Sequence, residues 1–516
     1  MKNIKFNESF FIIFSALASL ILFLPIFLQD IVYLDRIFLP DDTYYTLTIA
    51  RNIANGCGAS IDCINKTSGF QPLITLFSIP AFLLTDNLYT PIKVAIGFSA
   101  IFGILTNVVM TLVYYKHTKN TVLSIIFGVF LIAFHNNILN YFNGLETSLA
   151  MFMGSLLIFM LQKYYGRSLS RVHILALGGL IAFAMLARID MSIMVFFIGL
   201  YLLVNHGLRS TFFIAVTALI IISPMWGYNL IYTGSILPES GQAVKNIVAF
   251  HQTVHLTPLK SMQMAWKTLD VFSLHYATSS FISLAILFLS CCHGVYAAIK
   301  NKNFTLELVL IVTMISMIGF YVFYLPAFWF FDRYLAFSLL LGVFLVFCLF
   351  EKIMVANRKM PTIKPFLFFM VSLFVFSNAI KMPLFFSKPE TTLYYGEKGA
   401  RGYMEIADFI VDNISENSTI ASMQSGALGY FAAKHNHRVH NLDGVVNNAV
   451  LPLILNKEVN VYLKENQVAY FADWSFNTFW LSNIVEDNSV QLEPLFSTKM
   501  QGDNDGYVVY KVLLRE

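Results

Sequence analysis

The sequence predicts a polytopic α-helical membrane protein with a soluble domain at its C-terminal end. Hydrophobic residues make up 57% of the 516 residues, and charged residues only 12%. Apolar runs recur from Phe10 to about Phe386, and several approach the ~20 residues that cross a hydrocarbon core. From Ser387 onward the composition becomes that of a globular domain. We therefore divide the chain into a membrane module, residues 1–386, and a C-terminal domain, residues 387–516.

About eleven membrane spans are expected. The first follows a short basic segment that could begin a signal peptide, but no clear small-residue cleavage site follows it, so we interpret it as a retained helix. The apolar segment Pro72–Leu84 contains Pro80 and is too short to span comfortably, which favours an interfacial or re-entrant helix. The expected spans are 10–28, 92–114, 121–137, 147–162, 172–188, 191–205, 211–227, 277–298, 305–325, 335–350 and 365–386.

The distribution of basic residues orients the chain. The net charge is only +4, which gives no indication of a nucleic-acid partner. Lys and Arg gather in alternate loops between the expected spans, as the positive-inside rule requires of cytoplasmic loops. We therefore expect the N-terminus in the cytoplasm. The long loops 29–90 and 228–276 and the C-terminal domain are then external.

The C-terminal domain has the pattern of a small α/β fold. An amphipathic helix is expected around Arg401–Ile414, and helical stretches separate some of the apolar runs that follow. Asp443 and Asp473 lie in this domain without a convergent catalytic set that we can identify, so we expect it to be a support. The strand-like runs are Thr419–Met423, Val439–Leu442, Val468–Trp474 and Tyr507–Leu514.

The first external loop contains two adjacent acids, Asp41 and Asp42, in LPDDTYYTLTIARNIANG. Desolvation and mutual repulsion can raise the pKa of one neighbouring carboxyl group and prepare it to take a proton. The alternative is that one of them caps the helix that follows, by accepting hydrogen bonds from its free N–H groups. Because a cap needs only one carboxylate, the other is available as a general base for a hydroxyl group.

Further polar residues lie at the external ends of the expected spans. Glu146 either begins a helix, whose dipole favours its charge, or contacts an acceptor hydroxyl as a second acid. Arg188 either forms a solvated turn with Asp190 or faces a polar cavity, as arginines at membrane depth usually do. Together with Arg333 it could then bind a phosphate through charge-assisted hydrogen bonds. Lys245 is a third candidate for the phosphate.

Two of the five cysteines, Cys57 and Cys63, lie in the first external loop. An oxidising compartment permits a disulfide between them, and two free thiols are the alternative. The other three cysteines lie in apolar runs and are expected to be packing residues. No Cys/His spacing typical of a metal site is present in the sequence. We expect no metal and no cofactor.

The segment DDTYYTLTIARNIANGCG, followed by TSGFQPL, resembles the first-loop signature of bacterial GT-C glycosyltransferases. Further similar segments are NGLETSL, LARID, YTGSILPESGQAVK and FDRYL, then SGALGYF, NLDGVVNN and VAYFADW in the C-terminal domain. The resemblance therefore covers nearly the whole chain, and it extends to family 39 and to aminoarabinose- and arabinofuranosyl-transferase-like enzymes. The sequence departs from the family pattern at three positions. The family has Asn in place of Ser68, often His in place of Gln71, and usually Pro in place of Ile189.

The resemblance implies a GT-C fold and an enzyme of the bacterial inner membrane. It would move a sugar from a polyprenyl-phosphate donor to an external hydroxyl of a glycan, lipid or protein, among membrane lipids. The catalytic base of the family falls on Asp41 or Asp42, and we favour Asp41 because Asp42 is better placed to cap. Arginines would stabilise the leaving phosphate, and displacement in one step would invert the anomeric centre.

Two other functions are considered. A transporter or flippase for a lipid-linked sugar tends to place charges at mid-membrane and to interrupt its helices there. Here the charges gather at the outer helix ends, and a soluble domain is attached. A polysaccharide polymerase or ligase is also embedded in the membrane but lacks the acidic signature of the first loop. We therefore expect a glycosyltransferase, whose sugar and acceptor the sequence does not identify.

Overall fold

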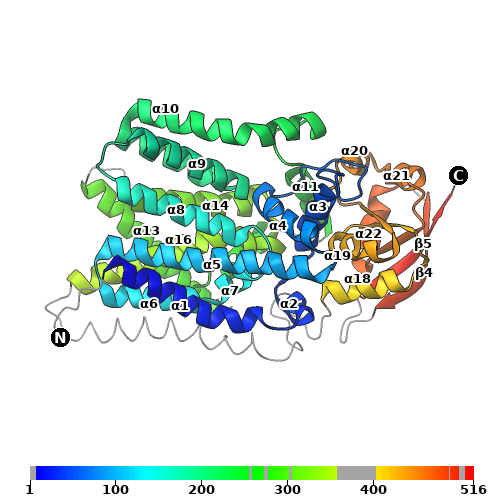
Figure 1. The fold of residues 1–516 in the computed structure, drawn as a ribbon, viewed down its shortest axis with the longest axis horizontal. Coiled ribbons are helices and arrows are strands. Elements are labelled where there is room, and N and C mark those ends of the chain that lie inside the picture. Colours follow the sequence, from blue (N-terminus) through cyan, green and yellow to red (C-terminus); the bar gives the residue numbers. More distant parts are fainter. Residues whose placement is uncertain are drawn as a thin grey trace.

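A computed structural model describes residues 7–254, 258–271, 277–301, 305–356, 402–486, 489–498 and 506–515. A bundle of long helices meets, at one end, a smaller domain that contains a five-stranded sheet (Figure 1). The helices of the loop 29–90 lie at this junction, beside the helices of the sheet domain. The fold class that the sequence predicts is confirmed.

Six described helical segments are long and apolar enough to cross a membrane, and a seventh is counted if the bent pair α6–α7 forms one span. The axes of α6 (Thr121–Ala133) and α7 (His135–Tyr141) differ by 56°. The six segments are provided by α1 (Glu8–Phe27), α5 (Tyr89–Thr118), α10 (Met191–Thr233), α13 (Ala277–Asn301), α14 (Leu306–Gly319) with η1 (Phe320–Tyr324), and α16 (Ala336–Ala356).

The expected number of eleven spans is not confirmed. Two further helices, α8 (Thr147–Tyr164) and α9 (Arg171–Ala187), coincide with expected spans but are not among the six. The two spans expected between 191 and 227 form the single element α10, which bends at Gly207, where φ is +78°. The span expected at 365–386 lies outside the described residues.

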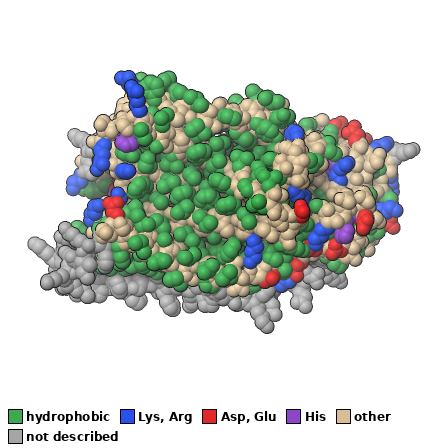
Figure 2. All heavy atoms as spheres, in the orientation of Figure 1, with side chains coloured by type: hydrophobic (Ala, Val, Ile, Leu, Met, Phe, Trp, Pro, Cys, Tyr) green, Lys and Arg blue, Asp and Glu red, His purple; other side chains and the backbone are tan. Residues whose placement is uncertain are grey.

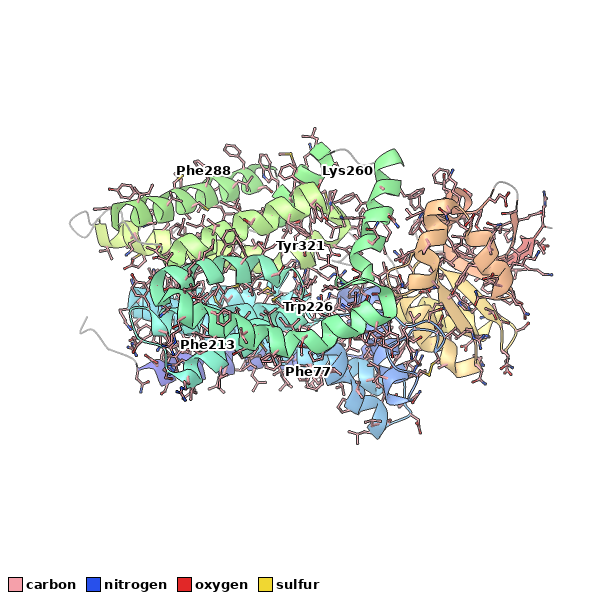
Figure 3. All side chains as sticks on the ribbon, turned by 90° about the horizontal axis from the view of Figure 1, so that it is seen from above. Phe77, Phe213, Trp226, Lys260, Phe288 and Tyr321 are labelled. Atoms are coloured by element: carbon pink, nitrogen blue, oxygen red, sulfur yellow. A yellow bond between two sulfur atoms is a disulfide. The ribbon has the colours of Figure 1, made fainter. Side chains whose placement is uncertain are left out.

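The surface of the bundle is apolar, as a hydrocarbon environment requires. Figure 2 shows hydrophobic side chains over the bundle, with Lys and Arg gathered at the end away from the sheet domain. In the view of Figure 3, Phe288 lies at the outer side of the bundle, whereas Tyr321 lies inside it. Phe288 is 68% exposed and Tyr321 only 3%. The lipid-facing and packed surfaces of the helices are therefore distinct.

The loop 29–90 folds into three helices, α2 (Ile31–Phe38), α3 (Asp41–Ala54) and α4 (Pro72–Leu84). The helix α4 has the bounds expected of the interfacial segment. Between α3 and α4 a disulfide joins Cys57 to Cys63, whose Cα atoms are 5.2 Å apart. The second external segment contributes α11 (Glu239–Val254) and α12 (Pro258–Thr268), and two short helices, η2 (Phe328–Phe330) and α15 (Phe331–Tyr334), precede α16.

The sheet of the C-terminal domain has the strand order β2-β1-β3-β5-β4. β1 pairs in parallel with β2 and β3, whereas β5 is antiparallel to β3 and to β4. The elements are α18 (Tyr403–Asp412), β1 (Thr419–Ser422), α19 (Gly426–Phe431), η4 (Ala432–His435), β2 (Arg438–Asn441), η5 (Asn448–Val450), α20 (Leu451–Asn456), α21 (Val459–Glu465), β3 (Tyr470–Trp474), α22 (Ser475–Ile484), β4 (Val490–Thr498) and β5 (Tyr507–Leu514).

The four strand-like runs of the sequence correspond to β1, β2, β3 and β5, and β4 was not predicted. Pro494 interrupts the apolar alternation of β4 and lies at a shift of its register with β5. A proline is tolerated there because β4 is an edge strand, so one side of its backbone needs no partner. The hydrophobic core continues from the bundle into α18 and α19, where Ile406 and Leu428 are buried.

Candidate active site

Asp41 and Asp42 are the first two residues of α3, after Pro40. Among the described residues no side chain caps this helix, so the expectation that one of the two acids caps it is wrong. Both still lie in the first turn, where the helix dipole favours negative charge. Because an α-helix has 3.6 residues per turn, neighbouring side chains point about 100° apart. The two carboxylates therefore reach different surroundings.

Asp41 points at the C-terminal domain. Its two carboxylate oxygens accept hydrogen bonds from the backbone N–H groups of Gly426 (2.9 Å) and Ala427 (2.8 Å). The residue is only 8% exposed. Burial raises the pKa of Asp41 to about 7, although the two hydrogen bonds oppose this shift. Both acceptor atoms of Asp41 are thus engaged by the start of α19.

Asp42 points at the end of the bundle that meets the sheet domain. Its Oδ2 lies 2.6 Å from Nη2 of Arg333, and the side chain of Asp42 is 29% exposed, against 8% for Arg333. The guanidinium of Arg333 also lies over the ring of Phe330, 4.7 Å from its centre. Asp42 is therefore the more accessible acid of the pair, and it lies beside a cation.

Arg188 forms the pair with Asp190 that the sequence suggested, but the pair is buried rather than solvated. Its Nε and Nη2 donate to the two oxygens of Asp190 at 3.1 and 3.0 Å, and Nη2 also donates to Tyr321 Oη at 3.2 Å. Its Nη1 donates to the backbone carbonyl of Arg333 at 3.1 Å. Arg188 thus fixes the backbone that carries Arg333.

Glu146 is buried immediately before α8, 8% exposed. Burial raises the pKa of Glu146, while the nearby charges of Arg188 and Arg333 lower it. A small cavity opens beside it, lined in part by Thr147, both arginines and Tyr334. The structure therefore brings together four of the residues that the sequence singled out: Asp42, Glu146, Arg188 and Arg333.

Lys245 lies at the border of this group, on α11. Its Nζ donates to Tyr324 Oη at 2.5 Å and lies over the Tyr324 ring, 4.0 Å from its centre. Val244 and Val248, on the same helix, pack with Phe330 beside Arg333. Lys245 therefore belongs to a helix that lines the site.

Sequence reasoning missed Glu239, which begins α11 and is 5% exposed. Its carboxylate accepts a hydrogen bond from the Thr67 hydroxyl, and its backbone N–H donates to Ser68 Oγ at 3.1 Å. Burial raises the pKa of Glu239 to about 7. The two external segments are thus tied together. A signal was present, because both partners lie in the segments YTGSILPESGQAVK and TSGFQPL that resemble the family pattern.

Asp443 comes closer to the acid pair than the sequence indicated. It is 7% exposed and accepts a hydrogen bond from Val445 N at 2.8 Å. Burial raises the pKa of Asp443 to about 8, and the charges of Asp42 and Asp41 add to the shift. Val445 packs against the cluster of Val244, Val248 and Ala327, to which Phe330 and Tyr334 also pack. The C-terminal domain therefore borders the site through the loop after β2.

Within the described ranges, no group of three or more His, Cys, Asp or Glu side chains could hold a metal ion. The charged groups of the residues described above are carboxylates, guanidinium groups and the ammonium of Lys245. Such a site can accept a proton from a hydroxyl and can stabilise an anion through charge-assisted hydrogen bonds.

Comparisons with known proteins bear on the fold. Residues 392–510 match a family described as a domain of unknown function (DUF8728). No curated protein matches the sequence. The oligosaccharyltransferase of Archaeoglobus fulgidus, in complex with Zn and sulfate, superposes with a TM-score of 0.57 at 15% identity, covering 96% of this chain and 72% of that one. ArnT of Cupriavidus metallidurans, bound to undecaprenyl phosphate, gives 0.55 at 13% identity and 98% coverage of each chain.

The similarity to these two structures extends over nearly the whole chain. It shows that this protein has the GT-C fold that the sequence resemblance predicts. The site described above lies in this fold at the junction of the bundle and the C-terminal domain.

Proposed function

We propose that this protein is a membrane glycosyltransferase that moves a sugar from a polyprenyl-phosphate donor to a hydroxyl group of an acceptor. The observation that carries the proposal is the pair of Asp42 and Arg333, with Glu146 close by, at the external end of an apolar bundle. The transfer needs a base for the hydroxyl and a cation for the leaving phosphate, and these residues supply both. The ArnT structure, bound to undecaprenyl phosphate, supports the choice of donor.

In this proposal Asp42, rather than Asp41, is the general base. Both oxygens of Asp41 already accept backbone hydrogen bonds, and Asp41 is almost fully buried. Asp42 is partly exposed and pairs with Arg333, which lines the small cavity. A base must lie within hydrogen-bond reach of the proton that it takes, and Asp42 is the more exposed of the two acids.

Arg333 is the residue proposed to bind the donor phosphate. When the donor phosphate replaces Asp42 as the partner of Arg333, the carboxylate of Asp42 becomes free to take the acceptor proton. The hydroxyl oxygen then forms the new bond to the anomeric carbon, and the bond from that carbon to the phosphate oxygen breaks. The electron pair stays on the phosphate, whose charge Arg333 stabilises. The attack and departure occur on opposite sides of the carbon, so the anomeric centre is inverted.

The other site residues support these two. Arg188 holds the backbone of Arg333 while its own charge is matched by Asp190. Glu146 is placed to accept a hydrogen bond from the acceptor sugar or hydroxyl. Lys245 is placed at the border, where it can attract the donor phosphate as it enters. We propose no metal and no cofactor for the reaction.

The proposed orientation follows from the basic loops. The N-terminus lies in the cytoplasm, and the site and the C-terminal domain lie outside the bacterial inner membrane. A reporter enzyme fused after residue 393 is expected to be active only in the external compartment. Cytoplasmic activity of that fusion would place Asp42 on the wrong side for an external acceptor.

Mass spectrometry of surface glycans tests the function. Cells that carry the wild-type protein are compared with cells that lack it and with cells that carry Asp42→Asn. We expect the mass of one sugar residue to be lost from a surface glycan, lipid or protein in both of the latter strains. Surface molecules with identical masses in all three strains would contradict a glycosyltransferase.

A further inference from the structure

Two helices of the C-terminal domain receive their N-terminal hydrogen-bond acceptors from the first external loop. Asp35, on α2, accepts a hydrogen bond from Met404 N at 3.0 Å, at the start of α18. Asp41, on α3, accepts from Gly426 N and Ala427 N at the start of α19. The first N–H groups of a helix have no partner within the helix. Side chains about 370 to 390 residues earlier in the chain supply the partner here.

Glycines allow this close approach. A Cβ atom added at Gly402 would lie 1.8 Å from Oδ2 of Asp35. A Cβ atom added at Gly426 would lie 2.2 Å from the backbone oxygen of Asp41 and 2.8 Å from its Cγ. All three distances are below ordinary contact. Gly402 is thus required by the carboxylate of Asp35, and Gly426 by the backbone and the carboxylate of Asp41.

The opposite end of α19 is bound by the same helix α3. Arg51 donates from Nη1 to the carbonyl of Tyr430 at 2.8 Å, and its guanidinium lies 5.2 Å from the centre of the Tyr430 ring. A carboxylate at the N–H end and a cation at the C=O end both match the helix dipole. α3 therefore holds α19 at both ends, with Asp41 and Arg51.

Tyr45, one turn after Asp41, adds a third contact. Its hydroxyl donates to the carbonyl of Met423 at 3.1 Å and accepts from Ser425 N at 2.9 Å. These atoms lie where β1 ends, at the carboxyl edge of the parallel strands. Open α/β sheets bind their ligands at this edge. Here that edge binds the first external loop of the membrane module instead.

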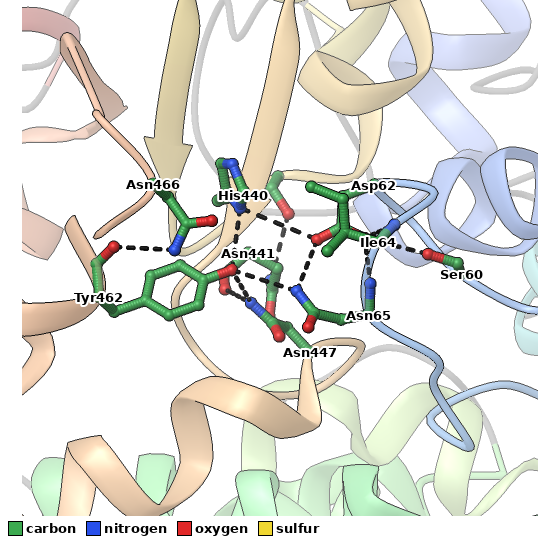
Figure 4. A network of polar contacts seen from close by, with 10 residues as sticks. Ser60, Asp62, Ile64, Asn65, His440, Asn441, Asn447, Tyr462 and Asn466 are labelled. Carbon is green, nitrogen blue, oxygen red and sulfur yellow. Dashed lines mark hydrogen bonds and ion pairs between the residues drawn. The ribbon is translucent and has the colours of Figure 1, made fainter. Parts of the chain in front are cut away.

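A separate polar network attaches the disulfide loop to β2 (Figure 4). His440 Nδ1 lies 2.8 Å from Tyr462 Oη and 3.8 Å from Asp62 Oδ2. Asn65 Nδ2 donates to Asp62 Oδ2 at 2.9 Å, and Asn447 Nδ2 donates to Tyr462 Oη at 2.9 Å. Asp41 makes none of these contacts, although Asn441 links the network to Tyr45 of α3. A change at the Asp41 contact therefore leaves a second attachment of the domain intact.

We propose that the C-terminal domain positions the catalytic carboxylate. By binding Asp41 and Arg51, α19 fixes α3 and so holds Asp42 opposite Arg333. The proposal rests on the proposed function of Asp42, and it gives the region of unknown function a role. Asp41 is then a positioning residue, joined to Asp42 by one peptide bond. A displacement of about 1 Å in a catalytic group can cost on the order of 10²-fold in rate.

Two glycine variants in the same helix test the proposal in the full-length protein. Gly426→Ala places a methyl group against Asp41, whereas Gly429→Ala adds one at an ordinary 3.8 Å from Val439 Cβ. Amide hydrogen exchange of the peptide that covers α3 is measured in detergent. Binding of undecaprenyl phosphate is measured on the same samples, and the fraction of modified surface glycan is measured in cells.

Gly426→Ala is expected to speed exchange in α3 and to lower the modified glycan at least tenfold. Binding of undecaprenyl phosphate should stay within about twofold, because Arg333 is untouched. Gly429→Ala should match the wild type in all three measurements. A merely structural role would instead lower binding and glycan modification together. If Gly426→Ala does not insert into the membrane, Arg51→Lys is used instead. A smaller increase of exchange in α3 and a smaller loss of modified glycan are then expected.

Equal exchange of α3 in the two variants would overturn the proposal, and so would faster exchange with full glycan modification. If the wild type modifies no glycan, the proposed function fails and the catalytic part of this inference fails with it. The exchange measurement then still decides whether α19 orders α3. The two failures are thus distinguishable.

Discussion

At the scale of single residues, Asp41 and Asp42 differ in their partners more than in their chemistry. Asp41 accepts two backbone hydrogen bonds from the C-terminal domain, and Asp42 pairs with Arg333. The family resemblance places the base on Asp41 or Asp42, and the sequence favours Asp41 because Asp42 is better placed to cap the helix. The partner of Asp41 lies 385 residues away, and no local pattern indicates it. The structure is therefore needed to assign the two roles.

Asparagine at each position separates the roles. Asp42→Asn cannot accept the proton, and activity is expected to fall by about 10²–10⁴-fold, as for a lost general base. Asp41→Asn keeps one acceptor oxygen, and we expect a fall of about tenfold with a lower melting temperature in detergent. Transfer from a synthetic polyprenyl-phosphate sugar measures both. An inactive Asp41→Asn beside an active Asp42→Asn would show that our assignment is reversed.

The two arginines are expected to respond differently to alanine. Arg333→Ala removes a charge-assisted contact worth about 2–3 kcal/mol, so binding of undecaprenyl phosphate should weaken by tens to hundreds of fold. Arg188→Ala leaves Asp190 buried without its partner, which typically costs about 3–5 kcal/mol of stability. Lipid binding and thermal melts in detergent distinguish the two. Weaker binding with unchanged stability in Arg188→Ala would instead make Arg188 a direct phosphate ligand.

At the scale of elements, periodicity predicted most of what is local. The helix α4 and four of the five strands lie where hydrophobic patterns placed them. β4 was missed because Pro494 interrupts its apolar alternation, and pairing with β5 outweighs this local signal. The long-range ion pair of Arg36 with Glu405, which joins α2 to α18, has no signal in the sequence. Tertiary pairing of this kind follows from packing and not from residue spacing.

The disulfide loop between α3 and α4 provides a test at this scale. Cys57–Cys63 closes a short loop, for which the chain-entropy model gives roughly 2 kcal/mol. The loop carries Asp62, which faces His440 in the C-terminal domain. Replacing both cysteines by serine should lower the melting temperature and speed hydrogen exchange in this loop and around His440. Exchange around Gly426 should change less, since α3 holds α19 by separate contacts. Unchanged exchange in the loop would show that the disulfide adds nothing to its order.

At the scale of the whole molecule, the junction between bundle and sheet domain is built around buried carboxyl groups. Burial raises the pKa of Asp35, Asp41 and Glu239 to about 7, and that of Asp443 to about 8. A folded-state pKa above the unfolded value means that the folded protein binds the proton more tightly. The resulting stability is present at low pH and is lost as pH rises through the folded pKa. Burial lowers the pKa of His440, so the unfolded protein binds this proton more tightly. The effect on stability is opposite: stability is gained as pH rises toward the ordinary pKa of 6.5.

The histidine effect fades as the unfolded-state imidazole loses its proton around and above pH 6.5, so the four carboxyl groups outweigh it and determine the trend there. We predict that the melting temperature of the full-length protein in detergent falls between about pH 6.5 and 8.5. Asp443→Asn should flatten this dependence, since the amide still accepts the hydrogen bond from Val445 and does not titrate. Asp86→Asn, at an exposed position, is the matched control and should leave the slope unchanged. A melting temperature that rises over this range, or an equal slope in both variants, would show that Asp443 is already ionised in the folded protein.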